Sequence, residues 1–186
     1  IGKKVKTVFS NNIAFCAQLE DGTLCAWGNS LGGGKLPEYL IGKKVKTVFS
    51  TDSAFCAVLE DGTMCAWGYS NGSGNLPEDL TGKKVKTVFS NNWAFCAVLE
   101  DGTLCAWGHP SHGGNLPKDL TGKKVKTMFS NNVAFCAVLE DGKMCAWGSP
   151  NFGGNLPENL TGRKVKTVFS NHGIFCAVLE DGTMCE

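Results

Sequence analysis

The chain of 186 residues has no long hydrophobic run, no excess of charge and only three histidines. No apolar run approaches the roughly 20 residues that a transmembrane helix needs, which disfavours a membrane protein. The formal net charge of +1 supplies no overall attraction to nucleic acid or to an anionic membrane. No histidine stands at a repeating position and no Cys-x2-Cys pair occurs, so we expect neither a metal site nor a cofactor.

Signatures of catalysis are missing as well. No Ser-His-Asp or Cys-His arrangement recurs, and Gly32-Gly33-Gly34 is not followed by the helix that a phosphate-binding loop requires. Paired carboxylates do recur, but each pair stands at a tight turn, where the aspartate bonds to its own backbone. These pairs are Glu20-Asp21, Glu60-Asp61, Glu100-Asp101, Glu140-Asp141 and Glu180-Asp181. We therefore predict a protein that is not an enzyme.

The chain contains one sequence of 40 residues that is repeated almost five times, without insertion or deletion. Such a fixed period is typical of repeat architectures. Each copy is one small structural unit that cannot bury its apolar surface alone, so neighbouring copies must stack. We interpret residues 1–186 as a single repeat domain with a truncated fifth copy, the copies being 1–40, 41–80, 81–120, 121–160 and 161–186.

Within the first copy the residue types predict three strands, at Val5–Ser10, Ala14–Leu19 and Thr23–Gly28. Gly22 in the Glu-Asp-Gly sequence predicts a tight hairpin between the second and third strands, because glycine adopts the positive φ that such turns require. In later copies these two strands are continuous apolar runs, which fits strands covered on both faces. A three-stranded antiparallel sheet packed between two others is a blade of a β-propeller, and a β-solenoid is the alternative.

The segment Ala54–Gly68 reads Ala-Phe-Cys-Ala-Val-Leu-Glu-Asp-Gly-Thr-Met-Cys-Ala-Trp-Gly, and a glycine-rich loop and Leu-Pro-x-x-Leu follow it. This order of motifs resembles the short variant of the RCC1-like repeat, whose units have roughly 40 residues. The resemblance covers every copy. It implies an all-β fold, a β-propeller of five RCC1-like blades with three antiparallel strands each and a truncated fifth blade.

The resemblance implies less about function. RCC1-like propellers include nucleotide-exchange factors, ubiquitin-ligase modules, photoreceptors and a secreted β-lactamase inhibitor, and a shared fold does not carry an activity. A regulatory exchange-factor role by analogy, which needs a GTPase partner, is one hypothesis. The family closes rings of about seven blades, whereas this chain offers five. A second hypothesis is therefore a self-assembling structural repeat protein whose incomplete ring closes by homo-oligomerisation.

The copies differ mainly in two segments, the turn after the first strand and the loop after Trp-Gly. Because the strands run up, down and up, both segments are predicted to lie on one rim, which we call the variable rim. Apolar groups among Asn and Ser are typical of recognition surfaces, and neutral drift of exposed loops is the alternative. We predict a non-enzymatic scaffold whose variable rim binds a protein or glycan through Ile13, Leu31, Tyr69, Trp93, His109, Val133, Phe152 and His172.

A basic Gly-Lys-Lys-Val-Lys motif recurs at the start of every copy, with Arg163 replacing one lysine in the last. A circle of such motifs can bind a polyanion. However, the Glu-Asp turn is predicted at the same end of the blade, and acidic residues follow the proline of every full copy. We expect mutual neutralisation, which disfavours a nucleic-acid partner.

Each copy carries two cysteines in the spacing Cys-x8-Cys. If the hairpin loop is Glu-Asp-Gly, Cys16 stands opposite Ala26, the two thiols of a blade point to opposite faces, and Cys25 can meet Cys56 of the next blade. With a two-residue loop, a bridge within one blade is the option, and burial as small hydrophobic residues is the alternative. Bridges would indicate an extracellular location, which the sequence otherwise leaves open. The candidate disulfide cysteines are Cys16, Cys25, Cys56, Cys65, Cys96, Cys105, Cys136, Cys145, Cys176 and Cys185.

Overall fold

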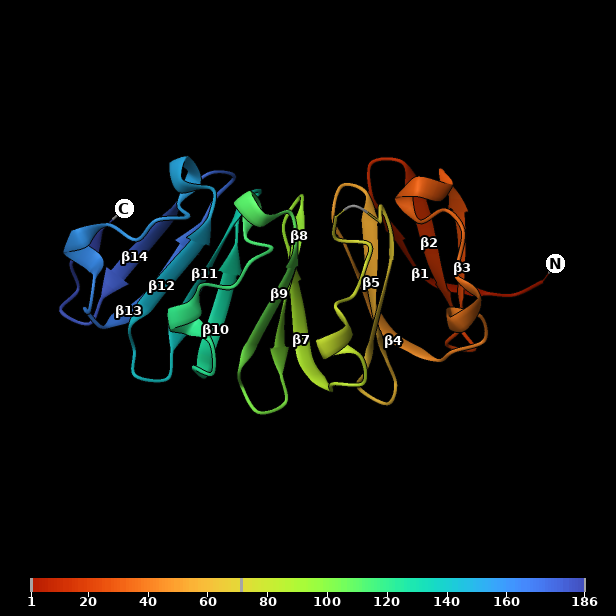
Figure 1. Ribbon diagram of the computed structural model, residues 1–186, viewed down its shortest axis with the longest axis horizontal. Coiled ribbons are helices and arrows are strands. Elements are labelled where there is room, and N and C mark those ends of the chain that lie inside the picture. Colours follow the sequence, from red (N-terminus) through yellow and green to blue (C-terminus); the bar gives the residue numbers. More distant parts are fainter. Residues whose placement is uncertain (1, 71, 186) are drawn as a thin grey trace.

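Each copy of the repeat folds into one three-stranded antiparallel sheet, with the strands in chain order (Figure 1). The computed structural model describes residues 2–70 and 72–185. The strands are β1 Val5–Ser10, β2 Ala14–Leu19, β3 Leu24–Gly28, β4 Val45–Ser50, β5 Ala54–Leu59, β6 Met64–Gly68, β7 Val85–Ser90, β8 Ala94–Leu99, β9 Leu104–Gly108, β10 Val125–Ser130, β11 Ala134–Leu139, β12 Met144–Gly148, β13 Val165–Ser170, β14 Phe175–Leu179 and β15 Met184–Cys185. The predicted five three-stranded units, with a short fifth, are confirmed.

Between the strands the described chain forms single turns of 3-10 helix. They are η1 Ser30–Gly32, η2 Glu38–Leu40, η3 Glu78–Leu80, η4 Pro110–His112, η5 Lys118–Leu120, η6 Pro150–Phe152 and η7 Glu158–Leu160. None of the helices in the described part of the chain is long and apolar enough to cross a membrane.

The third strand begins one residue later than predicted, at Leu24 rather than Thr23. The reason lies in the turn, where the Asp21 carboxylate accepts hydrogen bonds from the Thr23 N–H at 2.9 Å and the Thr23 hydroxyl at 2.6 Å. These bonds hold Thr23 in the turn, and Gly22 has the predicted positive φ, 81°. The same contacts recur in the second, third and fifth copies.

The turn carboxylates make stability depend on pH at the acidic end. Hydrogen bonds from Thr23 lower the pKa of Asp21 from 3.8 to about 2, and the equivalent bonds from Thr103 lower the pKa of Asp101. The folded chain therefore binds these protons less readily than the unfolded chain does. This contribution to stability is complete above the ordinary pKa of 3.8 and is lost as the pH falls to about 2. We expect the denaturant midpoint, followed by circular dichroism, to fall across that window.

The fourth copy supplies a control, because Lys143 stands where the other copies have threonine and lowers the pKa of Asp141 mainly through its backbone N–H. In a Thr103→Val variant, an NMR titration should show the pKa of Asp101 moving upward while that of Asp141 stays unchanged. An Asp101 that titrates as before would show that the threonine hydroxyl does not cause the shift.

Successive sheets stack face to face as blades, and each joint between two blades has its own apolar core. At the first joint, Cys16 of β2 packs in one cluster with Phe55 of β5 and Trp67 of β6. The indole N–H of Trp67 also donates a 3.0 Å hydrogen bond to the carbonyl of Gly33, in the loop that leaves the preceding blade. Burying one large apolar side chain stabilises a fold by roughly 1.5–3 kcal/mol. Three further clusters repeat this packing along the chain.

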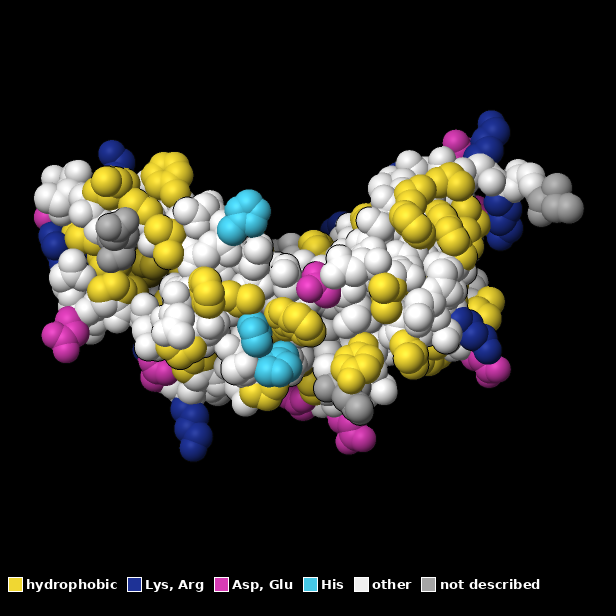
Figure 2. Space-filling model, turned by 90° about the horizontal axis from the view of Figure 1, so that it is seen from above, with side chains coloured by type: hydrophobic (Ala, Val, Ile, Leu, Met, Phe, Trp, Pro, Cys, Tyr) yellow, Lys and Arg dark blue, Asp and Glu magenta, His cyan; other side chains and the backbone are white. Residues whose placement is uncertain are grey.

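The five blades form a curved row rather than a closed ring (Figures 1 and 2). The first blade, with β1, lies at one end of the row, and the fifth, with β14, lies at the other. Side chains of the first blade that correspond to buried ones elsewhere are exposed, including Val5 and Trp27. The two ends of the row therefore present apolar surface that the middle blades bury.

All ten cysteines are free thiols in the structure. Cys16 pairs with Ala26, which is the register expected for a Glu-Asp-Gly loop. The predicted meeting of Cys25 with Cys56 is wrong, because Cys16 and Cys65 share the first joint while Cys56 lies at the second. Burial raises the pKa of the Cys16 thiol to about 12, which makes it a poor nucleophile.

Candidate functional site

The two segments that differ most between copies meet at one rim of the molecule. In the first blade, the Asn11 side-chain amide donates a 2.7 Å hydrogen bond to the carbonyl of Gly32. The Asn29 N–H donates a 2.9 Å bond to the carbonyl of Ile13. The turn after the first strand and the loop after the third are therefore joined directly, on the side of the blade that the strand order predicted.

One polar side chain in each full blade fixes the shape of the variable rim. The Oδ1 of Asn131 accepts hydrogen bonds from the backbone N–H groups two and three residues on, at 2.9 and 2.8 Å, and its Nδ2 donates to the Phe152 carbonyl at 2.8 Å. Asparagine is favoured in turns for this kind of bonding. In the second blade Thr51 takes this place, and its hydroxyl lies 2.9 Å from that of Ser73. The backbone frame is thus retained in blades that carry different rim side chains.

The eight predicted site residues lie in these two segments, one or two from each blade. Large apolar side chains are exposed at Ile13, Leu31, Tyr69, Trp93 and Phe152. The remaining three are the exposed His109 and His172 and the half-buried Val133. The structure brings two of the predicted residues together, since the ring centroids of Trp93 and His109 are 6.3 Å apart.

A third ring, His112, joins Trp93 and His109 in this cluster, with its centroid 5.8 Å from Trp93. The Nδ1 atoms of the two histidines are 3.0 Å apart, and each is 3.0 Å from the Ser111 hydroxyl. Burial and the nearby His109 lower the pKa of His112, which favours its neutral form. Within residues 2–70 and 72–185, no group of three or more His, Cys, Asp or Glu side chains is placed to hold a metal ion. The cluster is an aromatic patch.

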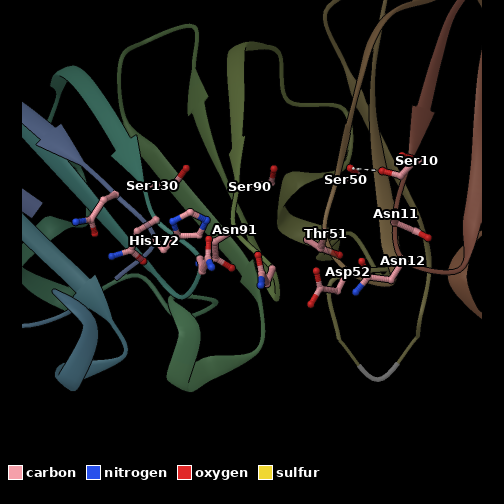
Figure 3. A pocket seen from close by; sticks show the side chains of 14 residues that line it. Ser10, Asn11, Asn12, Ser50, Thr51, Asp52, Ser90, Asn91, Ser130 and His172 are labelled. Carbon is pink, nitrogen blue, oxygen red and sulfur yellow. Dashed lines mark hydrogen bonds between the residues drawn. The ribbon is translucent and has the colours of Figure 1, made fainter. Parts of the chain in front are cut away.

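A polar cavity of about 520 Å³ opens where the first strands of the blades end. Figure 3 shows side chains from successive blades around this common space. Of the eight predicted residues, His172 alone lines it. The lining residues are Ser10, Asn11, Asn12, Ser50, Thr51, Asp52, Ser90, Asn91, Asn92, Ser130, Asn131, Asn132, Asn171 and His172.

A chain of backbone hydrogen bonds runs around the cavity from blade to blade. The Asn12 N–H donates to the Asp52 carbonyl at 3.2 Å, and the Asp52 N–H donates to the Asn92 carbonyl at 2.8 Å. The Asn92 N–H likewise donates to the Asn132 carbonyl at 3.0 Å, and the Asn132 N–H donates to the His172 carbonyl at 3.2 Å. These bonds occupy four of the five backbone N–H groups and four of the five carbonyls at these positions, so the side chains largely set the chemistry of the cavity.

Asp52 is the one carboxylate among the residues that line the cavity. Burial raises the pKa of Asp52, and a hydrogen bond from the Asn12 side chain opposes that shift. Apart from the His172 imidazole, the other lining side chains are amides and hydroxyls, which donate and accept hydrogen bonds without a charge. The cavity therefore suits peptide groups or hydroxyls of a ligand better than a strongly charged group.

The sequence patterns predicted the apolar residues of the rim and missed the polar cavity inside it. Asn12, Asp52, Asn92 and Asn132 belong to the first variable segment but are not among the eight predicted site residues. A signal for them exists, because a Ser-Asn-Asn or closely related triplet ends the first strand of every copy, as in residues 10–12. In a stack of equivalent blades, equivalent strand ends meet around one axis.

Comparison with known proteins gives a likeness in structure. No protein-family model matches the chain, and no curated protein is similar to it in sequence. Among solved structures, it is similar to the CRINKLY WD40 ectodomain of the Arabidopsis thaliana receptor kinase ACR4, with a TM-score of 0.59 and 16% identity over 96% of this chain and 60% of that one.

Two further similar structures are Prp20p of Saccharomyces cerevisiae, which is yeast RCC1, and human WBSCR16. Their TM-scores are 0.61 and 0.60, with 17% and 18% identity, each over 97% of this chain. The chain spans 56% of the length of Prp20p and 60% of that of WBSCR16. At these identities the likeness concerns the fold.

Proposed function

We propose that this chain, which has the fold of the RCC1-like β-propellers, is a non-enzymatic recognition module that binds a protein partner through its variable rim. One observation carries the proposal. The rim side chains differ from copy to copy, whereas the backbone that holds them has the same arrangement in each full blade. The position of Ile13 holds Ser53, Trp93, Val133 and Gly173 in the other blades. A surface built in this way presents a different side chain from each blade at equivalent places.

The chemistry of the rim also favours a protein partner. Trp93 is a large, partly exposed side chain whose ring lies against His109 and His112, so little rotamer freedom remains to be lost on binding. Partly exposed aromatic anchors beside hydrogen-bonding groups are typical of the centre of protein interfaces. The amides and hydroxyls of the cavity supply those groups next to the apolar side chains.

Structures with this fold supply a precedent for binding proteins. The Prp20p structure was described together with its binding properties to Gsp1p and histones. Yeast RCC1 was also solved bound to Kap60. From these proteins we take only the class of ligand, which is a protein. We do not take the identity of any partner.

The test compares the wild-type chain with a variant that carries Tyr69→Ala, Trp93→Ala and Phe152→Ala. A matched control carries Glu60→Ala, Glu100→Ala and Glu140→Ala, which are exposed residues at the turns of the opposite rim. Each immobilised chain is incubated with an extract of the organism that produces it, and retained proteins are quantified by mass spectrometry. We expect the wild type and the control to retain the same specific proteins. The amount of these proteins that the rim variant retains should be lower by more than about tenfold.

Stability serves as the internal check, because the three rim side chains are exposed. The unfolding free energy of the rim variant should stay within about 1 kcal/mol of the wild type. Proteins retained equally by all three chains would contradict recognition through this rim. Retention of soluble oligosaccharides, and not of proteins, with the same dependence on the three side chains would replace a protein partner with a glycan.

A further inference from the structure

The third blade carries a pair of histidines that no other copy has. His109 and His112 stand at the start and the end of one turn of 3-10 helix, since His109 caps η4 and His112 is its last residue. A 3-10 helix has three residues per turn, so side chains at positions i and i+3 lie one above the other. The sequence predicts no metal site, because no histidine repeats from copy to copy. The turn nevertheless brings two histidines together within a single copy.

Three atoms that can bind a metal ion meet in this turn. The Nδ1 atoms of His109 and His112 are 3.0 Å apart, and the Ser111 hydroxyl oxygen is 3.0 Å from each of them. An ion about 2.1 Å from each of three atoms spaced in this way would have angles of about 90° between its bonds to them. That is the angle between ligands on one face of an octahedron, so the other positions around the ion are left for water.

The two imidazole rings have the orientation that a shared ion requires. Their centroids are 4.7 Å apart and their planes are at 77° to each other. Two imidazoles bound at right angles to one ion through bonds of about 2.1 Å have centroids about 4.6 Å apart. If the two Nδ1 atoms pointed straight at each other across a hydrogen bond, the centroids would be about 5.3 Å apart. The observed spacing therefore fits two nitrogen atoms that converge on one point.

Hydrogen bonds fix the backbone beneath the two histidines. The His109 carbonyl accepts bonds from the N–H groups of His112 and Gly114, at 3.0 and 2.9 Å. The His112 carbonyl accepts a 2.7 Å bond from the side-chain amide of Asn91. The His109 N–H donates a 3.0 Å bond to the Trp93 carbonyl. The turn is therefore formed before a ligand arrives, which lowers the cost of binding.

The fourth blade has the same turn without the same chemistry. In η6 the Phe152 N–H donates a 3.1 Å hydrogen bond to the Ser149 carbonyl, as His112 donates to His109 in η4. Ser149 and Phe152 stand in the places of the two histidines, so η6 lacks both imidazole nitrogens. The residues of the third copy, rather than the fold of the loop, thus create the cluster of ligand atoms.

The cluster is open to water on one side only. The ring centroid of Trp93 lies 5.8 Å from that of His112, and this contact covers the half-buried His112. His109 and Ser111 are exposed, and the pair of histidines lies at the surface beside hydrophobic side chains (Figure 2). An ion can therefore enter from solvent and keep water molecules on its free positions.

We propose that His109, Ser111 and His112 bind one divalent transition-metal ion, through both Nδ1 atoms and the Ser111 oxygen. Imidazole nitrogen suits Ni²⁺, Cu²⁺ and Zn²⁺, whereas Mg²⁺ and Ca²⁺ prefer oxygen ligands. Permanent zinc sites use three or four strong protein ligands, and this site has two imidazoles and a hydroxyl. We therefore expect reversible binding, with a dissociation constant between about 1 µM and about 1 mM.

The test titrates Ni²⁺ into the chain, produced without a polyhistidine tag, and measures the heat of binding. We expect one ion per chain and no binding of Mg²⁺. His109→Asn and His112→Asn should each weaken the affinity by more than about tenfold, because losing even an outer-shell partner of a metal ligand costs about that much. Ser111→Ala should weaken it by a smaller factor, since water can replace the hydroxyl oxygen. His172→Asn, at an exposed histidine of the fifth blade, is the matched control and should bind like the wild type.

NMR spectroscopy locates the ion. Paramagnetic Ni²⁺ should broaden the ring signals of Trp93, which lies against His112, more than those of Trp27, which belongs to the first blade. With diamagnetic Zn²⁺, the nitrogen chemical shifts of His109 and His112 should show that Nδ1, rather than Nε2, is bound in both rings.

Four results would overturn the proposal. They are no binding of Ni²⁺ up to about 1 mM, wild-type affinity in either His109→Asn or His112→Asn, wild-type affinity in Ser111→Ala, and binding through Nε2. Each measurement uses the chain alone, so none of these results bears on whether the variable rim binds a protein.

Discussion

An alanine in place of Phe95 should lower the free energy of unfolding by about 3–5 kcal/mol, whereas the same change at Phe15 should lower it by less than about 1 kcal/mol. The two phenylalanines occupy equivalent positions in β8 and β2, each followed by Cys-Ala. Each also lies against the tryptophan of its own blade, with ring centroids 5.3 Å and 5.5 Å apart. Local sequence therefore does not distinguish them.

Burial in a joint does distinguish them. Phe95 is 0% exposed in the cluster between the second and third blades, whereas Phe15 is 46% exposed on the first blade. Truncating Phe95 leaves a cavity that neighbouring side chains fill only in part, and Phe15 has no such surroundings to lose.

The measurement is guanidinium unfolding followed by circular dichroism. Equal losses at the two positions would mean that the sheets, and not the joints between them, supply the stability.

The second large effect is expected at Gly108, where alanine should cost about 2–5 kcal/mol. Gly108 has a φ of 115°, and a Cβ atom there would lie 2.6 Å from the carbonyl oxygen of Trp93. Both the backbone conformation and the contact are unfavourable for any side chain. Gly122 provides the control, because its φ is 76° and a Cβ atom there meets nothing within 4 Å. Its replacement by alanine should cost only the roughly 1–2 kcal/mol of a left-handed residue.

Gly108 also connects stability to the rim. The backbone that follows it is held by a 3.0 Å hydrogen bond from the His109 N–H to the Trp93 carbonyl, the same oxygen that a Cβ atom would displace. Gly108→Ala should therefore move His109 away from Trp93, which NMR contacts between the two rings would report. A Gly108→Ala chain as stable as the Gly122→Ala chain would show that the third strand and the turn are free to separate.

The strands could be predicted from the sequence because they depend on local chemistry repeated five times. The Asp21-Gly22 turn, the β-branched first strand and the apolar second and third strands each carry their own signal. The start of β3 was missed by one residue, because the hydrogen bonds that hold Thr23 in the turn compete with the strand pattern.

The features that were missed depend on how the blades stack. Alternation along a strand assigns residues to the two faces of a sheet, but it does not indicate which face meets the next blade. For this reason the sequence predicts a meeting of Cys25 with Cys56. In the structure, Cys16 and Cys65 share the first joint. The cavity needs the curvature of the row, which brings Asn12 and His172 to one space although 160 positions separate them (172 minus 12). Neither fact is present within a single copy.

The uniform length of the repeat has a consequence for how such a chain can change. Each joint uses the same two faces and the same backbone hydrogen bond, from a valine N–H to a glycine carbonyl. Excising residues 81–120 would therefore place the second blade against the fourth, with equivalent partners throughout. Blade number in this architecture is set by how many times the unit is written, and the size of the cavity at the axis follows from it.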